Sequence, residues 1–202
     1  GDVYKRQPEK GMPYIYLSDA TQGVHMRDNL SDPTMVRQLE RSTAFPCPIS
    51  LAATFNPSLA YRYAEAVGEE CRAGGIEVLL GPGMNIYRNS QNGRNFEYMG
   101  EDPLLASAMV AEYVKGMQST GTVACLKHFI CNETEFYRRR SNSIVDERAL
   151  HELYRILKPG GWGILLSPVE PDYEQTYEDD SITDPEERTR IFGQYLSLIH
   201  IS

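Results

Sequence analysis

The sequence predicts an α/β fold, either a parallel sheet or an α/β barrel. Apolar segments of strand length alternate with amphipathic segments of helix length between residues 13 and 154. Most of the connections between these segments are short. Glycine and proline residues stand at the boundaries, where they end helices and form turns. Strands and helices in alternation are typical of a parallel sheet covered by helices.

Two strands are predicted in the first part of the chain. Residues 13–17 are apolar and aromatic, and they lie between Gly11 and the polar pair Ser18-Asp19. This pattern fits a buried strand whose end leads into a loop. Residues 49–55 form the second candidate strand.

The first helix is predicted by signals at both of its ends. Asn56 is a capping residue, Pro57 fits the first helical position, and Gly74-Gly75 ends the helix. Apolar side chains recur on one face between these ends, at Leu59, Tyr63, Ala66, Val67 and Cys71.

A strand at residues 76–80 follows, and it ends in the turn Gly81-Pro82-Gly83. The second helix is predicted from Pro103 to about Ser119, and Gly121 ends it. Glu101 and Asp102 precede this helix, where its positive end favours acidic residues. We therefore interpret both acidic residues as helix-start residues and not as ligand-binding residues.

A further strand and a third helix complete the regular pattern. Residues 123–127 are predicted as the strand. The helix is expected to begin at Asp146 or Ser143 and to run through Leu150 and Tyr154.

Composition argues against several classes of partner. The formal net charge is -8 and the pI is about 5.1, so nucleic acid and an anionic membrane would repel the chain. The basic run at residues 138–140 is shorter than a nucleic-acid footprint usually needs.

The four cysteines contain no CxxC pair, and no histidine has zinc-ligand spacing, so we predict no metal and no redox cofactor. No apolar run reaches the ~20 residues that span a bilayer, and the compartment stays open.

Polar side chains gather after the predicted strands, where parallel α/β folds carry their chemistry. They are Asp19, then Asn85, Arg88 and Arg94 after the glycine-proline-glycine turn, then Lys127 and His128. Carboxylate, guanidinium, ammonium and imidazole groups all hydrogen-bond to hydroxyls, so the pattern predicts a pocket for a small polar ligand. Gly81-Pro82-Gly83 lacks the Lys-Ser or Lys-Thr ending of a phosphate loop.

Two of these residues have a structural alternative. Asp19 could cap the turn that follows it. Arg94 could form an ion pair with Glu97 or Glu101. Both alternatives stay open on the sequence.

The last strand end raises the same question. His128 could be a hydrogen-bonded core histidine, but Lys127 beside it is hard to bury without a partner, which favours a pocket. We interpret His25 and Cys125 as packing residues.

Four segments together resemble the amino-terminal barrel of glycoside hydrolase family 3. They are "SDATQGVHMR" (18–27), "TAFPCPISLAATFNPSLAYRYAEAVGEECRAGGIEVLLGPGMNIYRNSQNGRNFEYMGEDP" (43–103), "KHFICNETE" (127–135) and "NSIVDERALHELY" (142–154). The resemblance runs from about residue 10 to residue 154, and we assign residues 8–154 to this domain. It implies roughly the first half of a TIM-type (β/α) barrel, followed by a short α/β extension.

The resemblance also implies a function. It points to an exo-acting retaining β-glycosidase, of the β-glucosidase or β-xylosidase type, that hydrolyses terminal β-linked sugars of an oligosaccharide or glycoside. Asp19, Arg94, Lys127 and His128 match the residues that bind the terminal sugar, and none of them is catalytic. Retaining hydrolysis needs two carboxyl groups about 5 Å apart. The family carries its nucleophile on a later barrel strand and its acid/base beyond the barrel, so we expect a fragment with the sugar-binding half of the site and no activity.

The remaining residues resemble something else. "RILKPGGWGILLSP" (155–168) and "TYEDDSITDPEERTRIFGQ" (176–194) resemble the carboxyl half of class I S-adenosylmethionine-dependent methyltransferases. We assign residues 155–196 to this second fragment, which lacks the glycine-rich cofactor turn. Residues 1–7 and 197–202 resemble translated sequencing-adaptor read-through.

Alternatives to the glycosidase interpretation stay open. In one, Gly160-Gly161 only ends a helix, and residues 162–167 form another barrel strand. The chain could also be a methyltransferase fragment, or a chimeric sugar-binding remnant without catalysis.

Overall fold

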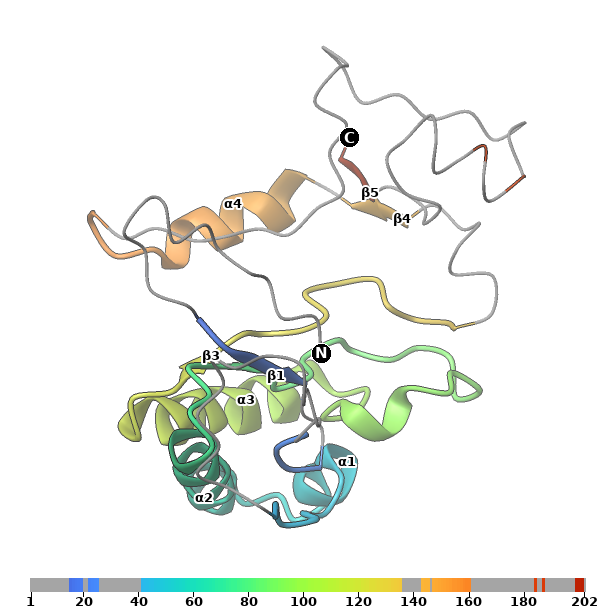
Figure 1. Cartoon of the computed structure of the whole chain (residues 1–202). Coiled ribbons are helices and arrows are strands. Elements are labelled where there is room, and N and C mark those ends of the chain that lie inside the picture. Colours follow the sequence, from blue (N-terminus) through green and yellow to red (C-terminus); the bar gives the residue numbers. More distant parts are fainter. Residues whose placement is uncertain are drawn as a thin grey trace. The chain divides into compact units, whose positions relative to one another are not determined.

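A computed structural model describes residues 15–19, 22–25, 41–135, 143–145, 147–160, 184, 187 and 199–201 of the chain (Figure 1). The chain divides into two compact units, Gly1–Thr134 and Glu135–Ser202. Each unit is described by itself.

The first unit contains a small parallel sheet. Its strands are β1 (Leu17–Asp19), β2 (Val78–Leu80) and β3 (Val123–Ala124), in the order β1-β2-β3. Leu17 is paired with Val78, and Val78 is paired with Val123. A further parallel bridge joins Gly83 to Lys127 just beyond these strands. The predicted α/β class with parallel strands is therefore confirmed.

Helices pack beside this sheet. They are α1 (Pro48–Ala52), α2 (Pro57–Ala73) and α3 (Pro103–Ser119), with the short 3-10 helix η2 (Asn95–Glu97) between β2 and α3. Figure 1 shows α2 and α3 side by side, with β1 and β3 on one side of the pair.

Both long helices begin and end where the sequence predicts. The Asn56 side chain accepts a hydrogen bond from the Leu59 N–H at 3.2 Å, and α2 ends before Gly74. The Asp102 side chain accepts one from the Leu105 N–H at 2.9 Å, so this residue is the helix-start residue that the sequence predicts. Each cap satisfies a backbone donor that the first helical turn leaves unpaired.

The predicted strand at residues 49–55 is wrong, because this segment contains α1. Pro48 occupies the first turn of the helix, where its missing N–H is not needed. The buried residues are Pro48, Leu51 and Ala52, which have the spacing of a helix face and not the alternation of a strand.

The first strand is displaced from its predicted position. The sequence places it at residues 13–17, whereas β1 covers Leu17–Asp19 and residues 13 and 14 lie outside the described residues. Pairing with β2 decides the position, because Leu17 is paired with Val78 and Asp19 with Leu80. Asp19 is therefore the last residue of the strand and not the first residue of a loop.

The core lies between α2, α3 and the sheet. Fully buried side chains include Ala60, Ala64, Val67 and Cys71 of α2, Leu79 of β2, and Met109 and Met117 of α3. Burial of a large apolar side chain contributes about 1.5–3 kcal/mol relative to exposure. The two long helices are in close contact at Gly116, since a Cβ there would overlap the Tyr61 carbonyl oxygen.

The second unit contains the third helix. It comprises β4 (Ser143–Val145), α4 (Glu147–Ile156) and β5 (Ile199–Ile201), and β4 pairs in parallel with β5. The predicted helix through Tyr154 is confirmed, but Ser143 is wrong as its start because this residue lies in β4. The other candidate start, Asp146, lies outside the described residues, as do residues 162–167.

None of the helices in the described part of the chain is long and apolar enough to cross a membrane.

Candidate functional site

The ends of the three parallel strands bring charged residues together. Asp19 is the last residue of β1, and Lys127 follows β3 by three positions. The Lys127 N–H donates to the Pro82 carbonyl at 3.1 Å, and its carbonyl accepts from the Met84 N–H at 2.7 Å. Parallel strands point the same way, so side chains far apart in sequence meet at one edge of the sheet.

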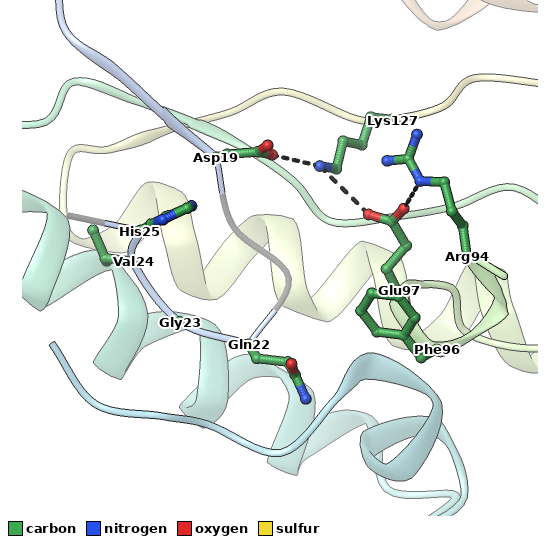
Figure 2. A pocket seen from close by; sticks show the side chains of 9 residues that line it. All are labelled: Asp19, Gln22, Gly23, Val24, His25, Arg94, Phe96, Glu97 and Lys127. Atoms are coloured by element: carbon green, nitrogen blue, oxygen red, sulfur yellow. Dashed lines mark hydrogen bonds and ion pairs between the residues drawn. The ribbon is translucent and has the colours of Figure 1, made fainter. Parts of the chain in front are cut away.

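A cavity of about 390 Å³ lies at this edge (Figure 2). Its size falls within the range of about 300–1,000 Å³ that is usual for small-ligand pockets. The lining residues come from β1 and the loop after it, from η2 and its flank, and from the end of β3; they are Asp19, Gln22, Gly23, Val24, His25, Arg94, Phe96, Glu97 and Lys127.

An alternating row of charges crosses the cavity. The Lys127 ammonium lies 2.7 Å from a carboxylate oxygen of Asp19 and 3.5 Å from Oε2 of Glu97. The other oxygen of Glu97, Oε1, pairs with Nε of Arg94. The exposed fraction of the side chain falls from 47% at Asp19 to 14% at Lys127 and 2% at Glu97, and it is 23% at Arg94, so Glu97 is the most buried member of the row.

This row matches the hydrogen-bonding chemistry of hydroxyl groups. Carboxylates accept hydrogen bonds, whereas ammonium and guanidinium groups donate them. A hydroxyl does both, so a ligand with several neighbouring hydroxyls can bond to such a row.

The loop after β1 is fixed against the sheet. The Ser18 hydroxyl donates to the His25 carbonyl at 3.0 Å, and the His25 N–H donates to the Asp19 carbonyl at 3.1 Å. Gly23 has φ +108°, and a Cβ there would overlap the Thr43 carbonyl oxygen, so only glycine fits.

The interpretation of His25 as a packing residue is wrong. The residue is exposed and lines the cavity.

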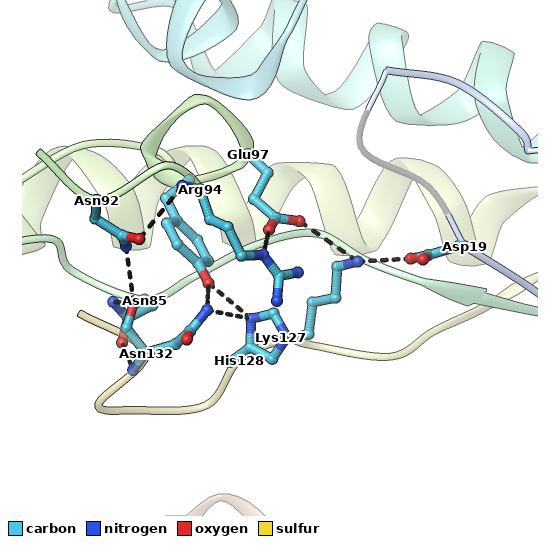
Figure 3. Close-up of polar contacts among 9 residues, drawn as sticks. Asp19, Asn85, Asn92, Arg94, Glu97, Lys127, His128 and Asn132 are labelled. Carbon is cyan, nitrogen blue, oxygen red and sulfur yellow. Dashed lines mark hydrogen bonds and ion pairs between the residues drawn. The ribbon is translucent and has the colours of Figure 1, made fainter. Parts of the chain in front are cut away.

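The His128 ring is bound through its Nδ1 atom. Its Nδ1 lies 3.2 Å from the Asn132 side-chain nitrogen (Figure 3). It also lies 2.7 Å from the Tyr98 hydroxyl, which Asn132 contacts as well. Tyr98 is fully buried, so the ring is anchored to the interior of the unit. His128 follows Lys127 directly in the chain but is not among the cavity-lining residues.

A cluster of asparagines ties the loops around the site together. The Asn85 and Asn92 side chains donate to the Asn132 carbonyl at 3.3 and 3.1 Å, and the Asn132 N–H donates back to Asn85 at 3.2 Å. Asn85 and Asn92 are buried, and buried amides of this kind need such partners. The loop after β2 and the loop after Lys127 are therefore fixed to each other (Figure 3).

The structure thus brings Asp19, Arg94 and Lys127 to one cavity and places His128 beside it. The two interpretations of Arg94 are not exclusive, since it pairs with Glu97 and also lines the cavity. Arg88 is an outlying residue, because its side chain is 82% exposed and pairs with Glu133 at 3.6 Å.

Sequence reasoning considered Glu97 only as an ion-pair partner and missed Tyr98 and Asn132. The spacing of Glu97, three residues after Arg94, is the signal that fits a shared turn. Tyr98 and Asn132 gave no comparable signal, because they are 34 positions apart in the sequence. Their loops meet only through the order of the strands in the sheet. Within the described ranges, no group of three or more His, Cys, Asp or Glu side chains could hold a metal ion.

Comparisons with known proteins give consistent matches. The model of the glycosyl hydrolase family 3 N terminal domain matches residues 29–152. The chain is 46% identical over 148 residues to beta-glucosidase BoGH3A of Bacteroides ovatus, a match that covers 73% of this chain and 20% of that protein. It is 42% identical over 144 residues to thermostable beta-glucosidase B of Acetivibrio thermocellus, with coverages of 71% and 19%.

A solved structure matches over the same extent. Beta-glucosidase 3B from Thermotoga neapolitana, in complex with glucose, superposes with a TM-score of 0.61 and 44% identity, and the match covers 73% of this chain and 20% of that one. The chain therefore spans about a fifth of the length of the relatives that it matches.

Proposed function

The chain belongs to glycosyl hydrolase family 3, and from that membership we propose that it is part of an exo-acting retaining β-glycosidase of the β-glucosidase or β-xylosidase type. In this proposal the cavity at the strand ends binds the terminal sugar of a β-linked glycoside. The observation that carries it is the charged row of Asp19, Lys127, Glu97 and Arg94 along the cavity.

The proposed contacts follow from the geometry. Asp19 is the more exposed of the two carboxylates in the row and accepts hydrogen bonds from sugar hydroxyls. Lys127 and Arg94 donate to the same sugar. His128, held by Tyr98, adds a ring nitrogen beside Lys127. Support comes from the Thermotoga neapolitana structure, which holds glucose and whose sequence is 44% identical to this chain over the match.

Replacing Asp19 with alanine tests this binding role. We expect the purified chain to bind glucose weakly, and the Asp19→Ala variant to lose that binding, because the carboxylate at the mouth of the cavity is removed. Ligand-observed NMR with glucose would measure the change. Since Asp19 is half-exposed, we expect the fold to persist.

Glu112→Ala is the matched control for Asp19→Ala. Glu112 also pairs with a lysine, Lys115, at 2.6 Å, but it lies on α3 and does not line the cavity. Equal loss of glucose binding in both variants, or retention in both, would contradict the assigned role of Asp19.

Hydrolysis is the second test. The family resemblance places the nucleophile on a later barrel strand, and the family match ends at residue 152. We therefore expect the purified 202-residue chain to release no nitrophenol from an aryl β-glucoside. Turnover that survives repurification and disappears in an Asp19→Ala variant would mean that catalytic carboxylates lie within this chain.

We also propose that the first unit is an incomplete (β/α) barrel, roughly its first half. The support is the order of three parallel strands, together with the position of the two long helices on the same side of β1 and β3 (Figure 1). A barrel covers only the outer face of its sheet with helices, whereas a doubly wound sheet covers both faces.

We further propose a junction near residues 148–157, after which the chain derives from a methyltransferase. The family match ends at residue 152, inside α4, and this agrees with a junction there. Single-molecule reads of the source DNA across the codons for residues 146–162 would test it. If reads cross the junction intact, the fusion is a real gene; if none does, the residues before the junction and residues 155–196 come from two separate parents.

A further inference from the structure

Glu97 is the charged side chain that the first unit buries most completely among its described residues. Only 2% of it is exposed, yet it forms part of the cavity wall. We propose that Glu97 is the positioning residue of the site: its carboxylate holds Arg94 and Lys127 in the orientation in which they bind the sugar. This inference rests on the proposed sugar-binding function.

The two carboxylate oxygens of Glu97 pair with two different cationic side chains. Oε1 pairs with Nε of Arg94, and Oε2 lies 3.5 Å from the Lys127 ammonium (Figure 2). Arg94 belongs to the loop after β2, whereas Lys127 follows β3, so one carboxylate joins two segments of the site. Glu97 contacts Arg94 at Nε, the guanidinium nitrogen nearest to the backbone. Figure 2 shows the two terminal nitrogens of Arg94 directed away from Glu97.

The backbone of Glu97 is itself fixed, which a positioning residue requires. Its N–H donates to the Arg94 carbonyl at 3.1 Å within the turn of η2. The Arg94 N–H in turn donates to the Asn92 side chain at 3.3 Å. On the other side, a Cβ on Gly83 would overlap the Glu97 carbonyl oxygen, so the end of β2 packs directly against this residue.

A purely stabilising role explains this arrangement less well. Burial of a carboxylate is unfavourable, and a buried ion pair is often no better for stability than apolar residues of the same volume. The cluster also faces a cavity instead of closing it. Such a cluster instead preorganises donors before the ligand arrives, which avoids their reorganisation on binding.

The experiment compares Glu97→Gln with Glu112→Gln in the full chain. The first substitution removes the buried charge at nearly constant shape, and the second removes a carboxylate of the exposed pair with Lys115. We expect Glu97→Gln to weaken glucose binding roughly 10- to 100-fold, the scale seen when supporting groups of a site are lost. Glu112→Gln is expected to bind glucose as the unchanged chain does.

Glu97→Asp separates positioning from simple charge neutralisation. It keeps the charge but is one methylene shorter, so its carboxylate no longer reaches both cations. We expect glucose binding in Glu97→Asp to stay weakened, and full recovery would overturn the inference. This variant also carries the test if Glu97→Gln does not fold, as judged by urea unfolding.

A readout without sugar completes the test. The rate at which acetic anhydride acetylates Lys127 reports whether Glu97 still binds its ammonium group. Mass spectrometry would measure this rate, with the acetylation rate of Lys115 as the internal reference. We expect Lys127 to be acetylated faster in Glu97→Gln, and an unchanged rate would overturn the inference. If acetylation rises but the unchanged chain binds no glucose, the proposed function fails while the positioning role of Glu97 stands.

Discussion

Replacement of Gly116 with alanine is expected to lower the free energy of unfolding of the first unit by about 2 kcal/mol. Overpacking of a close-packed interior typically costs about 1–3 kcal/mol, and a clash with rigid atoms lies at the upper end. A Cβ on Gly116 would overlap the Tyr61 carbonyl oxygen and lie 2.9 Å from the carbonyl carbon. These are backbone atoms of α2, so they cannot rotate away and α2 and α3 must separate.

Helix propensity opposes this loss but does not cancel it. Alanine is more favourable than glycine inside a helix by about 1 kcal/mol. We therefore expect a net decrease, measured as a shift of the urea unfolding midpoint.

Two other glycines give a graded control for Gly116→Ala. Gly93 has nothing within 4 Å of an ideal Cβ, so Gly93→Ala is expected to change the stability by no more than about 0.5 kcal/mol. On Gly68 the new Cβ would overlap the Thr120 hydroxyl, a side-chain group that can move, so an intermediate effect is expected. If Gly116→Ala were as mild as Gly93→Ala, α2 and α3 would not approach as closely as described.

Replacement of Lys127 with methionine is expected to abolish glucose binding and to destabilise the fold. Methionine keeps most of the apolar stem but removes the ammonium that lies between Asp19 and Glu97. Removal of one partner of a buried ion pair costs about 3–5 kcal/mol, since the other charge stays buried without compensation. Glu97 retains Arg94 here and Asp19 is half-exposed, so we expect about 2–3 kcal/mol.

A double variant identifies the source of the Lys127 effect. Glu97→Gln removes the buried charge that Lys127→Met leaves undercompensated, so the combined loss should be smaller than the sum by roughly 0.5–3 kcal/mol. Lys115→Met is the control, because this lysine is 64% exposed and a surface pair contributes about 0–1 kcal/mol. Strict additivity of Lys127→Met and Glu97→Gln would mean that the two charges do not interact.

Local signals predicted the long helices well. Asn56 and Pro57 begin α2, and Asp102 and Pro103 begin α3, as the sequence indicates. Caps, prolines and glycines act within one helical turn, so their effect is readable without knowledge of distant residues.

The shorter elements were predicted less well, because an apolar run does not specify a hydrogen-bonding partner. Residues 49–55 were expected to be a strand but contain α1, where one helix face is buried against its neighbours. The first strand was predicted at residues 13–17, whereas β1 covers Leu17–Asp19, because its position depends on pairing with Val78 and Leu80 of β2. A strand is completed by its neighbour, and the neighbour is far away in the sequence.

The sequence by itself determined the α/β class, the two long helices and the family, and it selected Asp19, Arg94, Lys127 and His128 as candidate sugar-binding residues. Only the tertiary structure decided how these residues meet. Pairing of β1, β2 and β3 places Asp19 next to Lys127 across 108 positions of the chain. The same packing buries Glu97 between two cations, because a carboxylate is stable in an interior only where other segments supply its partners.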